Sequence, residues 1–241
     1  MSLIKTPAIV LGSRNLGEAD KMVTLFTPRQ GKITGTAGGA RRVRSRFGSS
    51  LEPFTHCHVI LFQKTRDALF RIQQADILRS FRELREDLER IFWASRVTSL
   101  TAAMVPEEEA NPALFTMLLE TLVSVLGKDG ELATRLFEIR LLKYAGYQPR
   151  LEMEGCLRCR QELDRADIFF SPVSGGIICK LCRDQEKGLA PPISRGTVAF
   201  IQQALRMPPQ LAVRLKAKQG MKDELKNLLE VYLDYLLGRS A

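Results

Sequence analysis

Four of the five cysteines stand in two pairs with the spacing of metal ligands. The pairs are Cys156 with Cys159 in "CLRC" and Cys179 with Cys182 in "CKLC", and 19 residues separate them. Two residues between ligands let one tight turn direct both thiolates at one ion, and two such turns complete a tetrahedron for Zn²⁺. Because four thiolates leave no open position for water, this zinc would be structural. Free thiols, disulfides and a redox pair are the alternatives.

The fifth cysteine, Cys57, lies between the chain's two histidines, His56 and His58. On a strand, the period of two sends Cys57 to one face and both histidines to the other. Two histidines on one face can hold a metal, but the sequence offers no third ligand nearby. We therefore expect Cys57 in the core and the histidines at the rim or on the surface.

No catalytic constellation stands out. The sequence has no phosphate-binding G-x-x-x-x-G-K-[ST] motif and no strand-linked G-x-G-x-x-G, and two histidines leave little for a triad. Glu18 and Asp20 in "GEAD" suggest a Mg²⁺ site, but an acidic pair in a turn is more often turn chemistry. The acidic run in "PEEEAN" is interpreted as a solvated helix end. We expect a protein that is not an enzyme.

Positive charge is concentrated in the first third of the chain. The net charge is +9; residues 1–80 hold 13 Lys and Arg against 5 Asp and Glu, and the remaining 161 residues hold 23 against 22. The stretch "GGARRVRSRFG", residues 38–48, places four arginines in six positions. This asymmetry predicts a polyanion-binding first domain, with nucleic acid the commonest polyanion. A solvated basic surface without a partner is the alternative.

The composition is that of a globular protein, with 45% hydrophobic residues. No apolar run approaches the roughly 18 residues that a membrane span needs. The N-terminus shows no cleavage site of a secretory signal. We expect a cytoplasmic protein without membrane contact.

The first 80 residues have the pattern of short strands separated by turns. Five runs rich in Val, Ile, Thr and Phe occur at residues 7–13, 21–27, 31–37, 56–64 and 68–78. Five short strands predict a small closed or partly open barrel, since a single layer of this size could not bury its apolar face. The arginine-rich stretch would then form a long loop between the third and fourth strands.

From residue 80 the pattern is helical. "SFRE" matches a capping box, with Ser80 as the cap and Glu83 reaching back. Five residues would follow on one face of this helix: Leu84, Leu88, Ile91, Phe92 and Ser95. A second helix would begin after Asn111 with Pro112 in its first turn. Further helices are expected at about 131–145, 194–206 and 221–237. We also expect "FFSPVSGGII" to form a hairpin that carries the second cysteine pair to the metal.

These motifs, in this order, resemble the RecO family of bacterial recombination mediators. The resemblance is carried by "GEADKMVTLFTPRQGKITGTAGGARRVRSRFGSSLEPF", "RLFEIRLLKYAGYQP", "CLRC", "FFSPVSGGIIC" and "CKLC", and it covers about residues 7–190. It implies an α+β multidomain protein, with an OB-fold at 1–80 and a helical domain at 81–241 whose zinc insert spans about 152–186. It also implies location in the cytoplasm at the bacterial nucleoid.

The resemblance further implies binding of single- and double-stranded DNA without covalent chemistry. Family members anneal complementary strands, including strands coated with single-strand-binding protein (SSB). With RecR, and in some pathways RecF, they help RecA load during RecF-pathway recombination and gap repair. A zinc-ribbon repair nuclease or glycosylase, and a scaffold that binds an acidic protein, are the alternatives.

Nine cations are expected to contact DNA phosphates: Arg14, Lys21, Lys32, Arg41, Arg42, Arg44, Arg46, Lys64 and Arg66. Phe47, beside the arginines, could stack on a base or anchor the loop in the barrel. The resemblance also suggests a pocket for the acidic SSB tail on the "RLFEIRLL" helix, formed by Arg135, Phe137, Arg140 and Leu141. Core packing is the alternative role of Phe137 and Leu141.

Overall fold

The computed structural model describes residues 2–65, 68–163, 167–212 and 214–239 of the 241-residue chain. By its internal contacts the chain forms two compact units, residues 1–134 and 135–241. The first unit contains the barrel together with the helices that follow it. The expected domain boundary at residues 80/81 stays a prediction.

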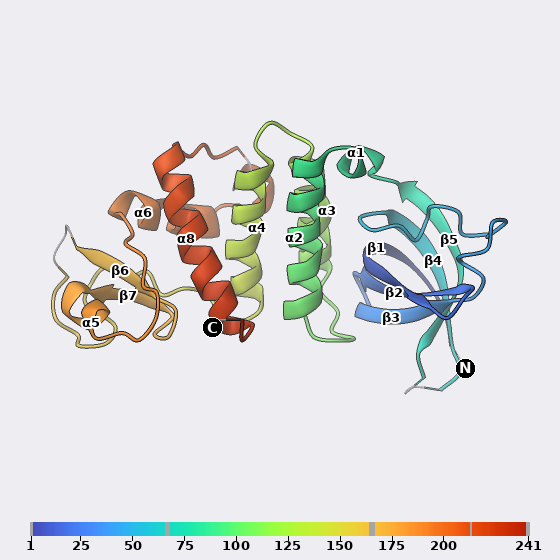
Figure 1. The fold of residues 1–241 in the computed structure, drawn as a ribbon, viewed down its shortest axis with the longest axis horizontal. Helices are drawn as coiled ribbons and strands as arrows, with labels where there is room; N and C mark the ends of the chain where they lie inside the picture. The colour runs from blue at the N-terminus through green and yellow to red at the C-terminus, as the bar shows by residue number, and fades with distance from the viewer. Residues whose placement is uncertain (1, 66–67, 164–166, 213, 240–241) are drawn as a thin grey trace. The chain divides into compact units, whose positions relative to one another are not determined.

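The first unit begins with a closed five-stranded barrel (Figure 1). Its strands are β1 (Ser2–Leu16), β2 (Asp20–Thr27), β3 (Gly31–Ala37), β4 (His56–Gln63) and β5 (Phe70–Arg79). They close in the order β1-β2-β3-β5-β4, and only β3 and β5 pair in parallel. The first half of β1 pairs with β4 and the second half with β2, across a register shift between Val10 and Gly12. The predicted barrel is confirmed, with the architecture of an OB-fold.

The helix expected after Ser80 is interrupted, and its predicted cap is wrong. The chain forms a short α1 (Arg82–Arg85), preceded by Phe81 in the left-handed region (φ 49°) with no side-chain cap. A new helix, α2 (Leu88–Met104), begins after Asp87, whose carboxylate accepts the Arg90 N–H. The break also changes which residues share a face: Leu84 is buried, whereas Leu88 is 85% exposed.

The next helix, α3 (Pro112–Val125), begins as predicted. The Asn111 side chain accepts the Leu114 N–H at 2.8 Å, and Pro112 stands where its missing N–H costs nothing. The Phe115 ring lies 6.2 Å from the ring of Phe26 and 5.9 Å from that of His56, centroid to centroid. These contacts pack α3 against the barrel.

The second unit takes most of α4 (Gly130–Tyr144) and the elements after it. These are β6 (Ile168–Ser171), β7 (Gly176–Cys179), α5 (Lys180–Asp184), α6 (Arg195–Arg206), α7 (Pro209–Ala212) and α8 (Gln219–Leu236). The predicted hairpin is confirmed as β6–β7, and the late helices correspond to α6 and α8, which pack against each other. Among the described residues, no helix is long and apolar enough to cross a membrane.

Candidate nucleic-acid interface and metal centre

Residues 38–55, here called the basic loop, connect β3 to β4 as a chain of turns. The loop is fastened to the turn between β1 and β2. The Arg41 N–H donates to the Ala19 carbonyl at 2.9 Å, and the Arg41 guanidinium donates to the Gly17 carbonyl at 2.7 Å. The Asp20 carboxylate accepts the Gly39 N–H at 2.8 Å. Asp20 therefore has a structural role as a turn acceptor, which favours that interpretation over a Mg²⁺ site.

Apolar side chains anchor the basic loop in the barrel. Phe47 and Leu51 belong to the barrel core, with 4% and 1% of their surface exposed. The Phe54 N–H donates to the Val10 carbonyl at 2.9 Å, which fixes the loop's far end to β1. Of the two roles considered for Phe47, burial favours the anchor, because a buried ring offers no face to a base.

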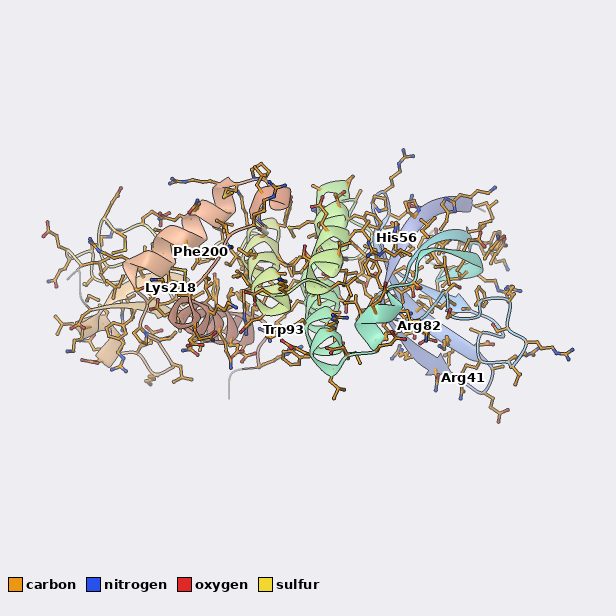
Figure 2. The ribbon with its side chains drawn as sticks, turned by 90° about the horizontal axis from the view of Figure 1, so that it is seen from above. Arg41, His56, Arg82, Trp93, Phe200 and Lys218 are labelled. Carbon is orange, nitrogen blue, oxygen red and sulfur yellow. The ribbon has the colours of Figure 1, made fainter. Side chains whose placement is uncertain are left out.

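The four arginines of the basic loop are all exposed. Between them, Val43 is fully exposed, and the Arg46 guanidinium lies 4.8 Å from the centroid of the Phe47 ring. Within the described part of the chain, none of the four makes an ion pair with a carboxylate. Figure 2 shows Arg41 at the barrel. The anchored loop thus presents four exposed cations that have no carboxylate partner, although the Arg41 guanidinium also donates to the Gly17 carbonyl.

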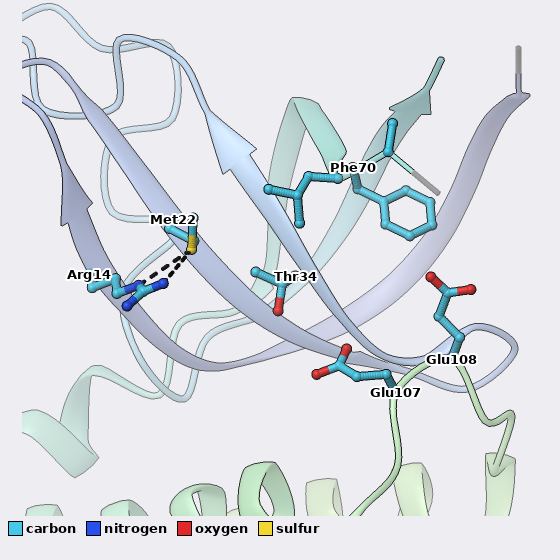
Figure 3. Close-up of a pocket in the computed structure, with 8 residues that line it drawn as sticks. Arg14, Met22, Thr34, Phe70, Glu107 and Glu108 are labelled. Carbon is cyan, nitrogen blue, oxygen red and sulfur yellow. Dashed lines mark hydrogen bonds between the residues drawn. The ribbon is translucent and has the colours of Figure 1, made fainter. Parts of the chain in front are cut away.

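The other expected DNA contacts differ in their availability. Arg14 and Lys64 are exposed, and the Arg14 guanidinium hydrogen-bonds the Met22 sulfur at 3.0 and 3.3 Å (Figure 3). By contrast, Lys21 pairs with Glu52 at 2.9 Å, and Lys32 lies 3.4 Å from the Glu107 carboxylate. Arg66 lies outside the described residues. Arg14 and Lys64 therefore extend the accessible positive surface, whereas Lys21 and Lys32 already have partners.

A pocket of about 700 Å³ opens beside Arg14 on the barrel (Figure 3). Met22 of β2, Thr34 of β3 and Phe70 of β5 contribute to its wall. OB-folds bind oligonucleotides on the face of strands 2 and 3. Glu107 and Glu108 also line this pocket. Sequence reasoning missed these two residues, because their place beside the barrel depends on the contact between Lys32 and Glu107, which are distant in the sequence.

The four paired cysteines converge as their spacing predicts. Their sulfur atoms all lie within 4.8 Å of one another, and the Cys159 and Cys179 sulfurs are 3.8 Å apart. Ligands at about 2.3 Å around a tetrahedral Zn²⁺ stand about 3.8 Å from each other. The backbone also contributes, since the Cys179 N–H donates to the Cys156 sulfur at 3.3 Å. The cluster has the geometry to hold a metal ion.

The thiols resist ionising together without a cation. Burial raises the pKa of Cys182 to about 12, and hydrogen bonds with the neighbouring thiols add to this rise. Burial also raises the pKa of Cys156, but backbone N–H groups, first that of Cys159, outweigh it and lower this pKa to about 6. Ionisation of one thiol is therefore favoured, and the negative charge of that thiolate opposes ionisation of the others. A divalent cation removes that penalty, so the donor set fits Zn²⁺.

The residues suggested for the SSB tail are buried. Arg135 is 1% exposed and pairs with Glu138 at 3.1 Å and Glu230 at 3.3 Å. The Arg140 guanidinium donates to the Met207 carbonyl at 2.7 Å. Phe137 and Leu141 are 1% and 0% exposed, which favours core packing. Tail binding at these residues stays a prediction, and it would require them to become accessible.

In the stretch from His56 to His58, the structure agrees with the expectation for Cys57 and differs from it for His56. Cys57 is fully buried in the barrel core, and burial raises its pKa to about 12. His56 faces Phe115 of α3 instead of lying at a rim, and burial lowers its pKa. Neither residue belongs to a metal-ligand cluster in the described part of the chain.

Comparison with known proteins identifies the family. The family model "Recombination protein O N terminal" matches residues 1–81, and "Recombination protein O C terminal" matches residues 85–241. The chain is 34% identical over 238 residues to the DNA repair protein RecO of Desulforamulus reducens, covering 98% of this chain and 91% of that protein. The RecO of Pelotomaculum thermopropionicum is 35% identical over 241 residues, covering 99% and 91%. The chain belongs to the RecO family. RecO proteins act in DNA repair and recombination, and the expected OB-fold matches the barrel described here.

Proposed function

We propose that this RecO protein binds single- and double-stranded DNA through its basic loop and anneals complementary strands. The observation that carries the proposal is the set of four exposed arginines on a loop that Phe47 and Leu51 anchor in the barrel. Anchoring reduces the conformational entropy lost on binding, and arginine suits phosphate because its planar fork donates two parallel hydrogen bonds.

Backbone contact explains how such a surface can anneal strands. Arg41, Arg42, Arg44 and Arg46 reach phosphates and leave base edges unoccupied, so sequence preference is weak. Neutralising phosphates on two strands reduces their repulsion, and the free base edges then pair. The protein acts by binding alone and breaks no covalent bond.

The cysteine cluster holds Zn²⁺ in a structural role. Cys156 and Cys159 precede the β6–β7 hairpin, while Cys179 and Cys182 end it and enter α5. One ion therefore crosslinks both arms of a segment with a small apolar core. When bound, the ion supplies this crosslink, and four protein ligands leave it no position for a substrate.

The family resemblance supports a role of the proposed annealing activity in recombination. The protein would act on SSB-coated strands, with the SSB tail bound by the second unit. Together with RecR, and with RecF in some pathways, it would assist the loading of RecA. RecR, SSB and RecA are partners proposed from the family resemblance alone.

The test is annealing of two complementary SSB-coated oligonucleotides, followed by fluorescence quenching. Wild type is compared with the basic-loop variant, in which all four arginines become alanine. The control is Arg206→Ala/Arg214→Ala/Lys216→Ala/Lys218→Ala, which loses the same charge from exposed positions of the second unit. We expect loss of annealing in the basic-loop variant alone. Absence of annealing by folded, zinc-loaded wild type would overturn the proposed function, and equal loss in both variants would remove the loop's special role.

A further inference from the structure

Residues 106–109, Pro-Glu-Glu-Glu, form an acidic segment between α2 and α3 that is docked on the barrel. The Glu108 N–H donates to the Lys32 carbonyl at 2.9 Å, and Lys32 and Glu107 form a parallel β-bridge. At Gly31 a Cβ would collide with the backbone of Glu109, and the φ of +65° also favours glycine. The backbone of the acidic segment is therefore docked along β3, while its three glutamate side chains remain exposed.

The acidic segment neutralises the cation of the face on which it lies. The partly exposed side chains on the outward face of β2 and β3, which alternate with the barrel core, are Asp20, Met22, Thr24, Lys32, Thr34 and Thr36. Lys32 is the one cation among these six. Its ammonium lies 3.4 Å from the Glu107 carboxylate and donates to the Ala102 carbonyl at 2.7 Å. A phosphate that approaches this face therefore meets no positive charge on the two strands that lacks a partner.

The same segment adds negative charge to the neighbouring pocket. Glu107 and Glu108 extend toward the space that Arg14, Met22 and Phe70 border (Figure 3). The Glu108 carboxylate has no ion-pair partner among the described residues, and its backbone takes the left-handed conformation (φ 57°) while its N–H holds Lys32. Two carboxylates that line the same pocket as a single guanidinium oppose a polyanion at the surface that OB-folds use for oligonucleotides.

We propose that the acidic segment is an internal competitor for the DNA backbone on the β2–β3 face. Its carboxylates occupy Lys32 and offset Arg14, so a strand is held strongly at the basic loop and weakly on this face. The inference rests on the proposed DNA binding and concerns its regulation. A weak second contact suits annealing, because strands that have paired must also be released.

The test measures binding of a labelled oligothymidylate to the full chain by fluorescence anisotropy. The variant is Glu107→Gln/Glu108→Gln, and the control is Glu83→Gln/Glu89→Gln, which changes the charge equally at exposed positions of α1 and α2. Removing the competing charges should tighten binding roughly three- to tenfold, since exposed charge pairs each contribute modestly. Freeing Lys32 and Arg14 for phosphates should also steepen the salt dependence by about 0.7 to 1.4 in the log–log slope. The control should match wild type.

A second variant protects the test against misfolding. Glu108→Gln breaks no ion pair in the described structure and should show part of the effect, with a circular dichroism spectrum like that of wild type. If wild type binds DNA and the segment variants bind no more tightly than the control, the inference is overturned while the proposed function stands. If neither wild type nor any variant binds, both fail.

Discussion

Replacing the four arginines of the basic loop by alanine tests how this surface holds DNA. Each phosphate neutralised on a single strand contributes about −0.7 to the slope of log affinity against log salt concentration. Four contacts therefore contribute about −2.8 to this slope, which is roughly a fiftyfold loss of affinity between about 50 and 200 mM salt. The four side chains are exposed and carry no ion pair in the described structure, so each is available for a phosphate.

The assay is fluorescence anisotropy of a labelled oligothymidylate titrated at several salt concentrations. The basic-loop variant should keep only the slope due to other cations, such as Arg14 and Lys64. The variant of Arg206, Arg214, Lys216 and Lys218 loses the same net charge and should keep the wild-type slope. The reasoning is refuted if the basic-loop variant keeps the full slope, or if both variants lose it equally.

Three further predictions concern stability. Cys156→Ser removes one of the four clustered thiols and should abolish zinc retention, which metal analysis measures. It should also lower the thermal stability of the second unit, while the affinity for an oligonucleotide is retained. Full zinc content with an unchanged melting curve would contradict the structural role of the metal. Phe47→Ala leaves a cavity in the barrel core and should cost about 3–5 kcal/mol of unfolding free energy in a denaturant titration, whereas an exposed Phe47 would cost almost nothing. Burial lowers the pKa of His56 below its usual 6.5, so the unfolded chain binds this proton more readily; stability should be fully present above that value and fall as the pH drops below it. His56→Gln should flatten that decline in pH-dependent melts, and an identical pH profile would show that this histidine is not its cause.

Much of the fold follows from local patterns in the sequence. Buried and partly exposed side chains alternate along the barrel strand β3 with a period of two. The helix cap at Asn111 depends only on two residues that are three positions apart, Asn111 and Leu114. The predicted start of the first helix is wrong because Ser80 and Asp87 are both suitable N-cap residues, and the local sequence does not show which of them is used. Asp87 caps the long helix, which leaves Leu88 exposed and no longer on the face of the buried Leu84.

The sequence by itself determined the chemistry that depends on residue type and short spacing. Two C-x-x-C pairs specify a four-thiolate cluster because two intervening residues already direct both sulfurs to one point. Four arginines in six positions specify a cationic loop wherever that loop lies, since guanidinium groups stay charged and seek water or anions.

Only the tertiary structure decided which of these groups are accessible and which have partners. Phe47 became an anchor because the barrel core receives its ring, and Arg135 is buried because carboxylates from α4 and α8 meet it. Lys32 and Glu107 are distant in sequence, and they pair because the acidic segment docks on the edge of β3. Burial and charge pairing depend on chain segments that meet only after folding, so no local pattern could have revealed them.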